Sequence, residues 1–83
     1  MVRWIGYRQS WRMSNAIWRA FGRRIRELRR KRKWSQEEFA YRIKMDTSYL
    51  SELETGKKEP CLTRIHRIAK GFGISISELM RDV

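Results

Sequence analysis

Two helix-starting signals lie close together in the middle of this chain and leave room for only a short helix between them. Ser35 and Glu38 form an S-x-x-E capping box, in which each side chain bonds the backbone amide of the other residue. Asp46 is a second N-cap residue, so the helix that follows Ser35 must end near Ile43. Two short helices joined by a turn are typical of a helix-turn-helix, here at Ser35–Leu53, although many helical hairpins share this pattern.

Apolar residues at helical spacing extend the prediction to the rest of the chain. We expect helices at Asn15–Lys33 with Ser14 or Asn15 as the cap, Ser35–Ile43, Thr47–Glu54 with Gly56 as a left-handed end, Leu62–Gly71, and Ile76–Arg81 after a second capping box at Ser75 and Glu78. No strand-like alternation persists. The expected fold is all-α, a compact five-helix bundle whose buried positions are Ile17, Phe21, Ile25, Leu28, Phe39, Ala40, Ile43, Leu50, Leu53, Leu62, Ile65, Ile68, Ala69, Phe72, Ile76, Leu79 and Met80.

The positive charge of the chain is concentrated in its first part. The formal net charge is +11, and residues 1–33 hold twelve of the 20 Lys and Arg residues with a single acid, Glu27. Residues 34–83 are electrically balanced. Such a basic segment is typical of a protein that binds a polyanion. The alternatives are a solvated helix face with a basic tail and an anionic membrane surface, and the motifs below argue against the membrane.

The sequence contains no combination of residues that would support catalysis. Cys61 is the single cysteine, so it can form no intramolecular disulfide and lacks partners for a metal site. His66 is the single histidine and is expected on the surface, and there is no Gly-rich phosphate loop. We therefore expect no enzyme activity, no cofactor and no metal. The basic start has no apolar signal segment and no run of about 20 apolar residues occurs, so we expect a cytoplasmic protein.

The residues inside the two short helices make the motif more specific. Gln36 begins the first helix, Ala40 is small where two helices cross closely, and Leu50 and Leu53 lie on the buried side of the second. With these positions the chain resembles the phage repressor and Cro-type helix-turn-helix proteins, the XRE family. The matching residues, spread over Phe21–Met80 without a gap, are Ile25-Arg26-Glu27-Leu28-Arg29, Trp34-Ser35-Gln36-Glu37-Glu38-Phe39-Ala40, Tyr49-Leu50-Ser51-Glu52-Leu53-Glu54-Thr55-Gly56-Lys57, Pro60, Leu62, Ile65, Ile68-Ala69-Lys70, Phe72-Gly73-Ile74-Ser75 and Glu78-Leu79.

The resemblance implies a lambda-repressor-like bundle whose second short helix enters the major groove of DNA. It places four side chains at base edges, namely Thr47, Ser48, Tyr49 and Glu52, and five at backbone phosphates, namely Gln36, Ser51, Lys57, Lys58 and Arg64. Gln36 could also brace Thr47. For Ser48, Ser51 and Arg64 the alternative is ordinary solvation.

The resemblance also implies two structural features. It pairs Glu54 with Arg29 as a structural ion pair and not as a catalytic acid. Lys44 stands where the family usually has glycine, so a left-handed backbone there would cost roughly 1 kcal/mol.

Residues 1–15 form a basic, Trp-rich extension before the domain of residues 16–83. Trp4, Trp11, Trp18 and Ile25 recur every seven residues, and Tyr7, Ser14, Phe21 and Leu28 fill the other positions of a coiled-coil seam. One hypothesis extends the first helix upstream, with this seam against the domain or a second subunit. The alternatives are a flexible arm that follows DNA, or a natural start at Met13.

Together these features predict a sequence-specific regulator of transcription, a repressor or dual regulator, that binds double-stranded DNA. We expect a homodimer on a (pseudo)palindromic operator, because one recognition helix reads only a few base pairs. Ile74, Ile76 and Met80 are the candidate dimer contacts, although core packing could claim all three. The alternative functions are an antitoxin or another protein-interaction module, whose partner would be a toxin or other protein, and RNA binding. The short format also resembles restriction–modification controller proteins.

Overall fold

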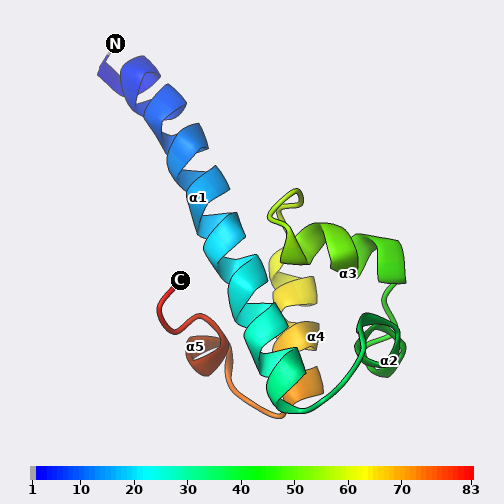
Figure 1. Ribbon diagram of the computed structural model, residues 1–83. Coiled ribbons are helices and arrows are strands. Elements are labelled where there is room, and N and C mark those ends of the chain that lie inside the picture. Colours follow the sequence, from blue (N-terminus) through cyan, green and yellow to red (C-terminus); the bar gives the residue numbers. More distant parts are fainter. Residues whose placement is uncertain (1) are drawn as a thin grey trace.

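Five helices account for most of the chain in the computed structural model, which describes the backbone of residues 2–83 and the side chains of residues 16–83. They are α1 (Val2–Lys31), α2 (Gln36–Arg42), α3 (Thr47–Glu54), α4 (Leu62–Phe72) and α5 (Ile76–Leu79) (Figure 1). No strand occurs among the described residues. The predicted all-α five-helix fold is confirmed.

The start of the first helix differs from the prediction. α1 begins at Val2, so neither Ser14 nor Asn15 is its cap. Ser and Asn favour the N-cap position, but either residue begins a helix only where the backbone before it is not helical, and here that backbone is part of α1. The side chains of Trp4, Tyr7 and Trp11 lie outside the described residues, as does that of Ser14, and the seam that they would form stays a prediction.

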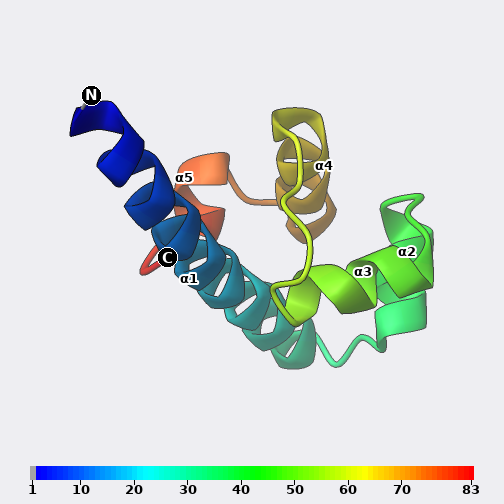
Figure 2. The same cartoon turned by 90° about the horizontal axis from the view of Figure 1, so that it is seen from above.

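The second half of α1 is the axis around which the other helices pack. Figures 1 and 2 show α2 and α3 on one side of it and α5 on another, while its first half projects beyond the bundle. Seven large side chains are almost fully buried in the core: Phe21, Ile25, Phe39, Leu50, Leu53, Ile68 and Leu79. They come from all five helices, so each helix is held through the same core.

Two predicted core positions are wrong. The side chain of Ile17 is 43% exposed and that of Leu62 is 69% exposed. Ile17 lies on α1 where that helix leaves the bundle, and Leu62 is the first residue of α4. Helical spacing identifies the face of a helix but does not show where along its length the bundle ends. Ile76 and Met80 are only partly buried against the core.

The helix caps are confirmed in part. Ser35 and Glu38 form both bonds of the predicted box, at 3.0 and 2.8 Å. Ser75 Oγ accepts from the amide of Glu78, but the Glu78 carboxylate turns to Arg81 instead of closing the second box. Asp46 occupies the N-cap of α3 without a side-chain bond. Gly56 has the predicted left-handed backbone, with φ of 77°.

A glycine sets the distance between α1 and α3. A Cβ atom on Gly22 would lie 2.5 Å from the carbonyl oxygen of Glu54 and closer still to that of Leu53. The end of α3 therefore rests directly on the α1 backbone.

No described helix combines the length and the apolarity that crossing a bilayer demands.

Candidate DNA interface

The turn between α2 and α3 is closed by backbone hydrogen bonds. The amides of Ile43, Lys44 and Met45 donate back to carbonyls of α2, and Lys44 is left-handed with φ of 54°. Ala40, which is 1% exposed, lies in the core where α2 meets α3. The expected left-handed lysine is therefore present, and the turn keeps its form without the usual glycine.

A buried carboxylate ties three helices together behind α3. Arg29 Nε donates to Glu54 Oε2 at 2.7 Å, and a second guanidinium nitrogen of Arg29 donates to Oε1 at 3.0 Å. Gln36 Nε2 and Arg26 Nε also donate to Oε1, at 3.0 and 3.4 Å. The Glu54 side chain has no exposed surface. Both carboxylate oxygens are thus satisfied by residues of α1 and α2.

The charge of Glu54 is favoured despite its burial. Burial, the largest single effect, would raise the pKa of Glu54, but the hydrogen bonds from Arg29 and Gln36 and the charge of Arg29 together bring the pKa below its usual value. Arg29 is also anchored, because it donates to the Trp34 carbonyl at 2.8 Å. This cluster fixes α3 against α1 and the start of α2.

The amide nitrogen of Gln36, which the sequence assigns to a phosphate, points to this cluster. Gln36 Nε2 bonds Glu54, and no hydrogen bond between Gln36 and Thr47 occurs among the described residues. Its backbone amide, one of the first N–H groups of α2, stays available to an anion. Arg26 is the member of the cluster that sequence analysis missed. Its spacing of three residues before Arg29 puts both on one side of α1 and was the available signal.

The outer side of α3 is polar. Ser48 is exposed, and Thr47, Tyr49, Ser51 and Glu52 are half-buried. The guanidinium of Arg64 lies 4.4 Å from the centre of the Tyr49 ring, so the two side chains act as one unit. Lys58 Nζ lies 3.9 Å from Glu52 Oε1. Tyr49 and Glu52 thus each have a cation beside them, Ser48 is open to solvent, and Thr47 is half-buried at the start of the helix.

The predicted phosphate-binding cations flank α3. Lys57 and Lys58 follow Gly56 in the connection to α4, and both are exposed. The amide of Lys57 bonds the Glu52 carbonyl at 2.9 Å, which fixes the chain direction after α3. Gly56 has no room for a side chain, because a Cβ there would lie 2.6 Å from Cγ of Arg19. Arg64, on α4, lies against Tyr49 of α3.

Trp34, Phe39 and Phe72 form an aromatic stack with two arginines, which the sequence did not predict. The rings of Phe39 and Phe72 are 4.2 Å apart, and Trp34 stacks on both at 5.7 and 6.1 Å. The guanidinium of Arg42 lies 4.2 Å from the Trp34 ring centre, and that of Arg32 lies 5.0 Å from the Phe72 ring. These cations cover apolar surface, which no spacing rule in the sequence indicates.

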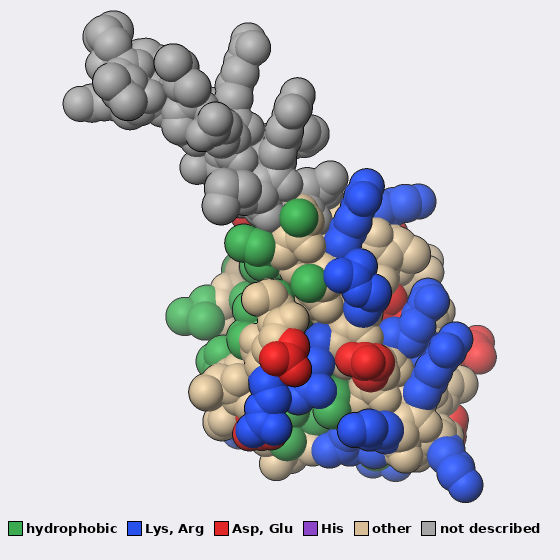
Figure 3. Space-filling model, turned by 60° about the vertical axis from the view of Figure 1, so that its left-hand side comes forward, with side chains coloured by type: hydrophobic (Ala, Val, Ile, Leu, Met, Phe, Trp, Pro, Cys, Tyr) green, Lys and Arg blue, Asp and Glu red, His purple; other side chains and the backbone are tan. Residues whose placement is uncertain are grey.

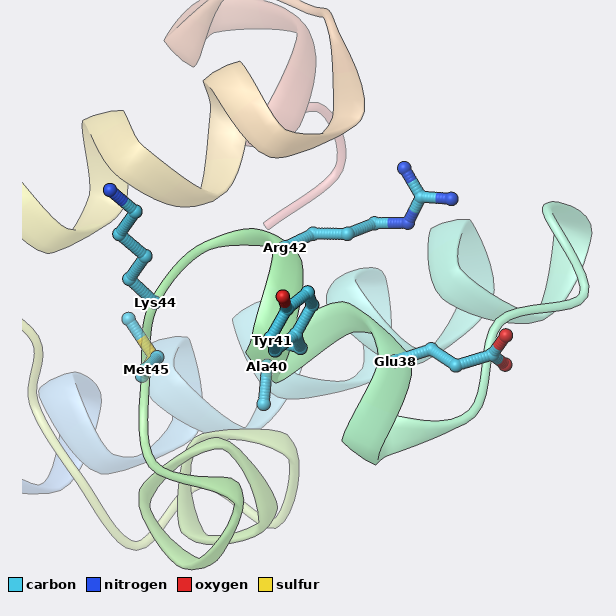
Figure 4. A pocket seen from close by; sticks show the side chains of 6 residues that line it. All are labelled: Glu38, Ala40, Tyr41, Arg42, Lys44 and Met45. Atoms are coloured by element: carbon cyan, nitrogen blue, oxygen red, sulfur yellow. The ribbon is translucent and has the colours of Figure 1, made fainter.

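Charged and hydrophobic side chains are unequally distributed over the surface outside α3. Figure 3 shows one face of the molecule on which Lys and Arg side chains are spread along one side and hydrophobic side chains gather on the other. Tyr41, 86% exposed, stands beside an open hollow next to Ala40 and Met45 (Figure 4). The candidate dimer contacts Ile74, Ile76 and Met80 are partly buried against the core.

The other candidate reactive groups are isolated. His66 and Cys61 are exposed, and the part of the chain whose side chains are described has no cluster of His, Cys, Asp and Glu that could hold a metal ion. The backbone amide of Arg64, close to Cys61 at the start of α4, lowers the pKa of the Cys61 thiol.

Comparison with known proteins agrees with the geometry. A model of the helix-turn-helix family matches residues 25–79. Control protein C.MunI of a Mycoplasma species is 41% identical over 64 residues, which cover 76% of this chain and 86% of that protein. The immunity repressor of Bacillus phage phi105 is 30% identical, over 74% of this chain and 42% of the repressor. The crystal structure of the restriction-modification controller protein C.AhdI from Aeromonas hydrophila superimposes with a TM-score of 0.75 and 36% identity, over 77% of this chain and 97% of that one.

Proposed function

Because the chain belongs to the helix-turn-helix family and is a DNA-binding regulator of transcription, we propose that it binds a (pseudo)palindromic operator as a homodimer. In this proposal α3 enters the major groove. Thr47, Ser48, Tyr49 and Glu52 contact base edges, and Gln36, Ser51, Lys57, Lys58 and Arg64 contact phosphates.

The polar outer side of α3, held rigidly from behind, is the observation that carries this proposal. Glu54 and Arg29 fix the buried side of the helix at 2.7 Å. Base reading needs side chains held within a few tenths of an ångström on a rigid element. Glu52 can accept from a cytosine amino group, and its neighbour Lys58 is then released to a phosphate.

The proposed homodimer has two-fold symmetry, because one recognition helix is too short to read a whole operator. A single α3 covers only a few base pairs, and two copies reach half-sites about one helical turn apart. Ile74, Ile76 and Met80 supply partly exposed apolar surface at one end of the bundle for this contact. Sedimentation over a range of protein concentrations tests the dimer, and a monomer at every concentration would contradict it.

Selection of bound duplexes from a random library tests the proposal as a whole. We expect an enriched site with two related halves. Glu52→Ala should relax the preference at one base position, whereas Lys57→Ala should weaken all duplexes about equally and lower the salt slope by roughly one unit. If no duplex is enriched, the operator proposal fails. If Glu52→Ala weakens every duplex equally, only the role of Glu52 fails.

Our second proposal is that the protein regulates the genes of a restriction–modification system. The specific observation is coverage: the chain spans 97% of a restriction-modification controller protein and 86% of C.MunI, but 42% of the phage repressor. Deleting the gene should change the transcripts of a neighbouring endonuclease or methyltransferase. A neighbouring toxin that binds the protein in a pull-down would instead support the antitoxin alternative.

A further inference from the structure

Four cationic side chains surround a surface hollow between the end of α2 and the middle of α4. Arg42 and Lys44 come from α2 and the turn, and Arg67 and Lys70 come from α4. The remaining lining residues are Ile43 and Gly71, so no carboxylate lines this hollow. We call these four residues the α4 strip, and none of them belongs to the binding residues assigned above.

Two members of the α4 strip are held in place and two are free of contacts that the fold needs. Arg67 donates to the carbonyl oxygen of Lys44 at 3.4 Å, and Arg42 stacks on Trp34 at 4.2 Å. Figure 4 shows Arg42 extending from the end of α2 and Lys44 extending from the turn in a different direction. All four residues are exposed, and among the described side chains none of them forms an ion pair.

The α4 strip is continuous with the recognition helix. A second hollow shares Lys44 and Arg67 with the first and is lined further by Tyr49 and Arg64, with Asp46 as its one acid. Arg64 is stacked on Tyr49 of α3. From Arg64 to Lys70 the rise along α4 is about 9 Å. A row of cations therefore leads from the edge of the recognition helix along the bundle.

From this placement we infer that the α4 strip binds backbone phosphates of the operator duplex beyond the bases that α3 reaches. The inference rests on the proposed function and extends its footprint. Cations that line one hollow without a carboxylate repel one another, and a phosphate backbone relieves that repulsion while it releases counterions. The duplex is favoured over an acidic protein because the row begins at the DNA-reading helix itself.

The test uses the enriched duplex in two lengths, one trimmed to the selected site and one with about one helical turn of arbitrary sequence added at each end. Wild-type protein should bind the longer duplex more tightly. Arg67→Gln combined with Lys70→Gln should remove about half of this gain, lower the salt slope on the longer duplex by roughly two units and leave the trimmed duplex almost unaffected. Lys70→Gln alone should show about half of the loss, and it avoids the Arg67 contact if the double variant folds poorly.

A matched control removes two exposed arginines from α1, as Arg23→Gln with Arg30→Gln, which changes the net charge by the same amount. It should affect both duplex lengths by the same factor. Equal wild-type affinity for the two lengths, or a double variant that binds both as the wild type does, overturns the inference while operator binding stands; the second result would favour an acidic protein partner. Failure of the wild type to bind either duplex overturns the proposed function instead.

Discussion

At the scale of single residues, Glu54 does the most to fix the interface, although it contacts no DNA in our proposal. Its carboxylate is fully buried and receives bonds from Arg29, Gln36 and Arg26. Glu54→Gln would leave the 11%-exposed Arg29 side chain without its counter-charge, and we expect a loss of about 3–5 kcal/mol in the free energy of unfolding. Urea unfolding checks this. The control Glu78→Gln, which removes an exposed pair with Arg81, should cost under about 1 kcal/mol.

The same residue predicts a pH dependence. The pKa of Glu54 is lowered in the folded protein from its ordinary value of 4.5, so its contribution to stability is fully present above that value and is lost as the pH falls through the folded pKa. Wild-type protein should therefore lose stability over this acid range. Glu54→Gln should lose less, and an identical acid dependence of the two proteins would contradict the assignment.

Lys44 carries a backbone conformation that its side chain does not favour. Its φ of 54° costs an L-residue about 1 kcal/mol, a cost that glycine avoids. Lys44→Gly should raise the free energy of unfolding by up to about 1 kcal/mol. Lys44→Ala removes the same charge but keeps the strained φ, so it should not stabilise the protein. Equal thermal shifts in the two variants would show that charge, and not backbone strain, is responsible.

At the scale of helices, the sequence predicts the short elements well and the long one poorly. The bounds of α3 agree residue for residue with Thr47–Glu54, because Asp46 and Gly56 enclose it. Chemistry that is local in sequence explains this success. The close approach of Gly22 to the end of α3 could not be predicted, because it joins backbones that are distant in the chain. The α4 strip was missed for the same reason.

The residues of the candidate DNA interface also fall into those that the sequence predicted and those that depend on how the helices pack. The contact between Arg29 and Glu54 was expected from the resemblance, and the structure places these side chains together. The bond that takes the amide of Gln36 to Glu54, and the stack of Arg42 on Trp34, depend on how three helices cross. The assignments to bases and phosphates stay predictions.

Arg24 joins α1 to the shortest helix. It donates to the carbonyl oxygens of Glu78 and Leu79 at 2.8 and 3.2 Å, where α5 ends. Arg24→Ala should cost about 1 kcal/mol and increase hydrogen exchange in α5 more than in α2 or α3. Because the candidate dimer contacts Ile76 and Met80 lie in α5 and directly after it, the dimer should also weaken. Arg23→Ala, the exposed neighbour, is the control, and equal exchange in the two variants would exclude this role.

At the scale of the whole molecule, attraction and discrimination lie in different parts of the chain. The helix-turn-helix and everything after it are electrically balanced, so the excess of +11 sits upstream of Trp34. An electrically neutral helix-turn-helix gains little from non-specific attraction to the phosphate backbone, and it discriminates between DNA sequences through short-range contacts. The basic part supplies long-range attraction that is independent of sequence.

Residues 1–15 provide the sharpest test of this division of roles. They contain Arg3, Arg8 and Arg12 and no acid. Deleting them should weaken binding to every duplex by a similar factor and lower the salt slope by up to about three units, because each phosphate contact contributes about 0.9. Changing only the three arginines to glutamine keeps Trp4 and Trp11, so it separates charge from aromatic packing. If the deletion leaves the salt slope unchanged but converts a dimer to a monomer, the extension packs on a second subunit through its tryptophans, and the attraction must come from α1 within the bundle.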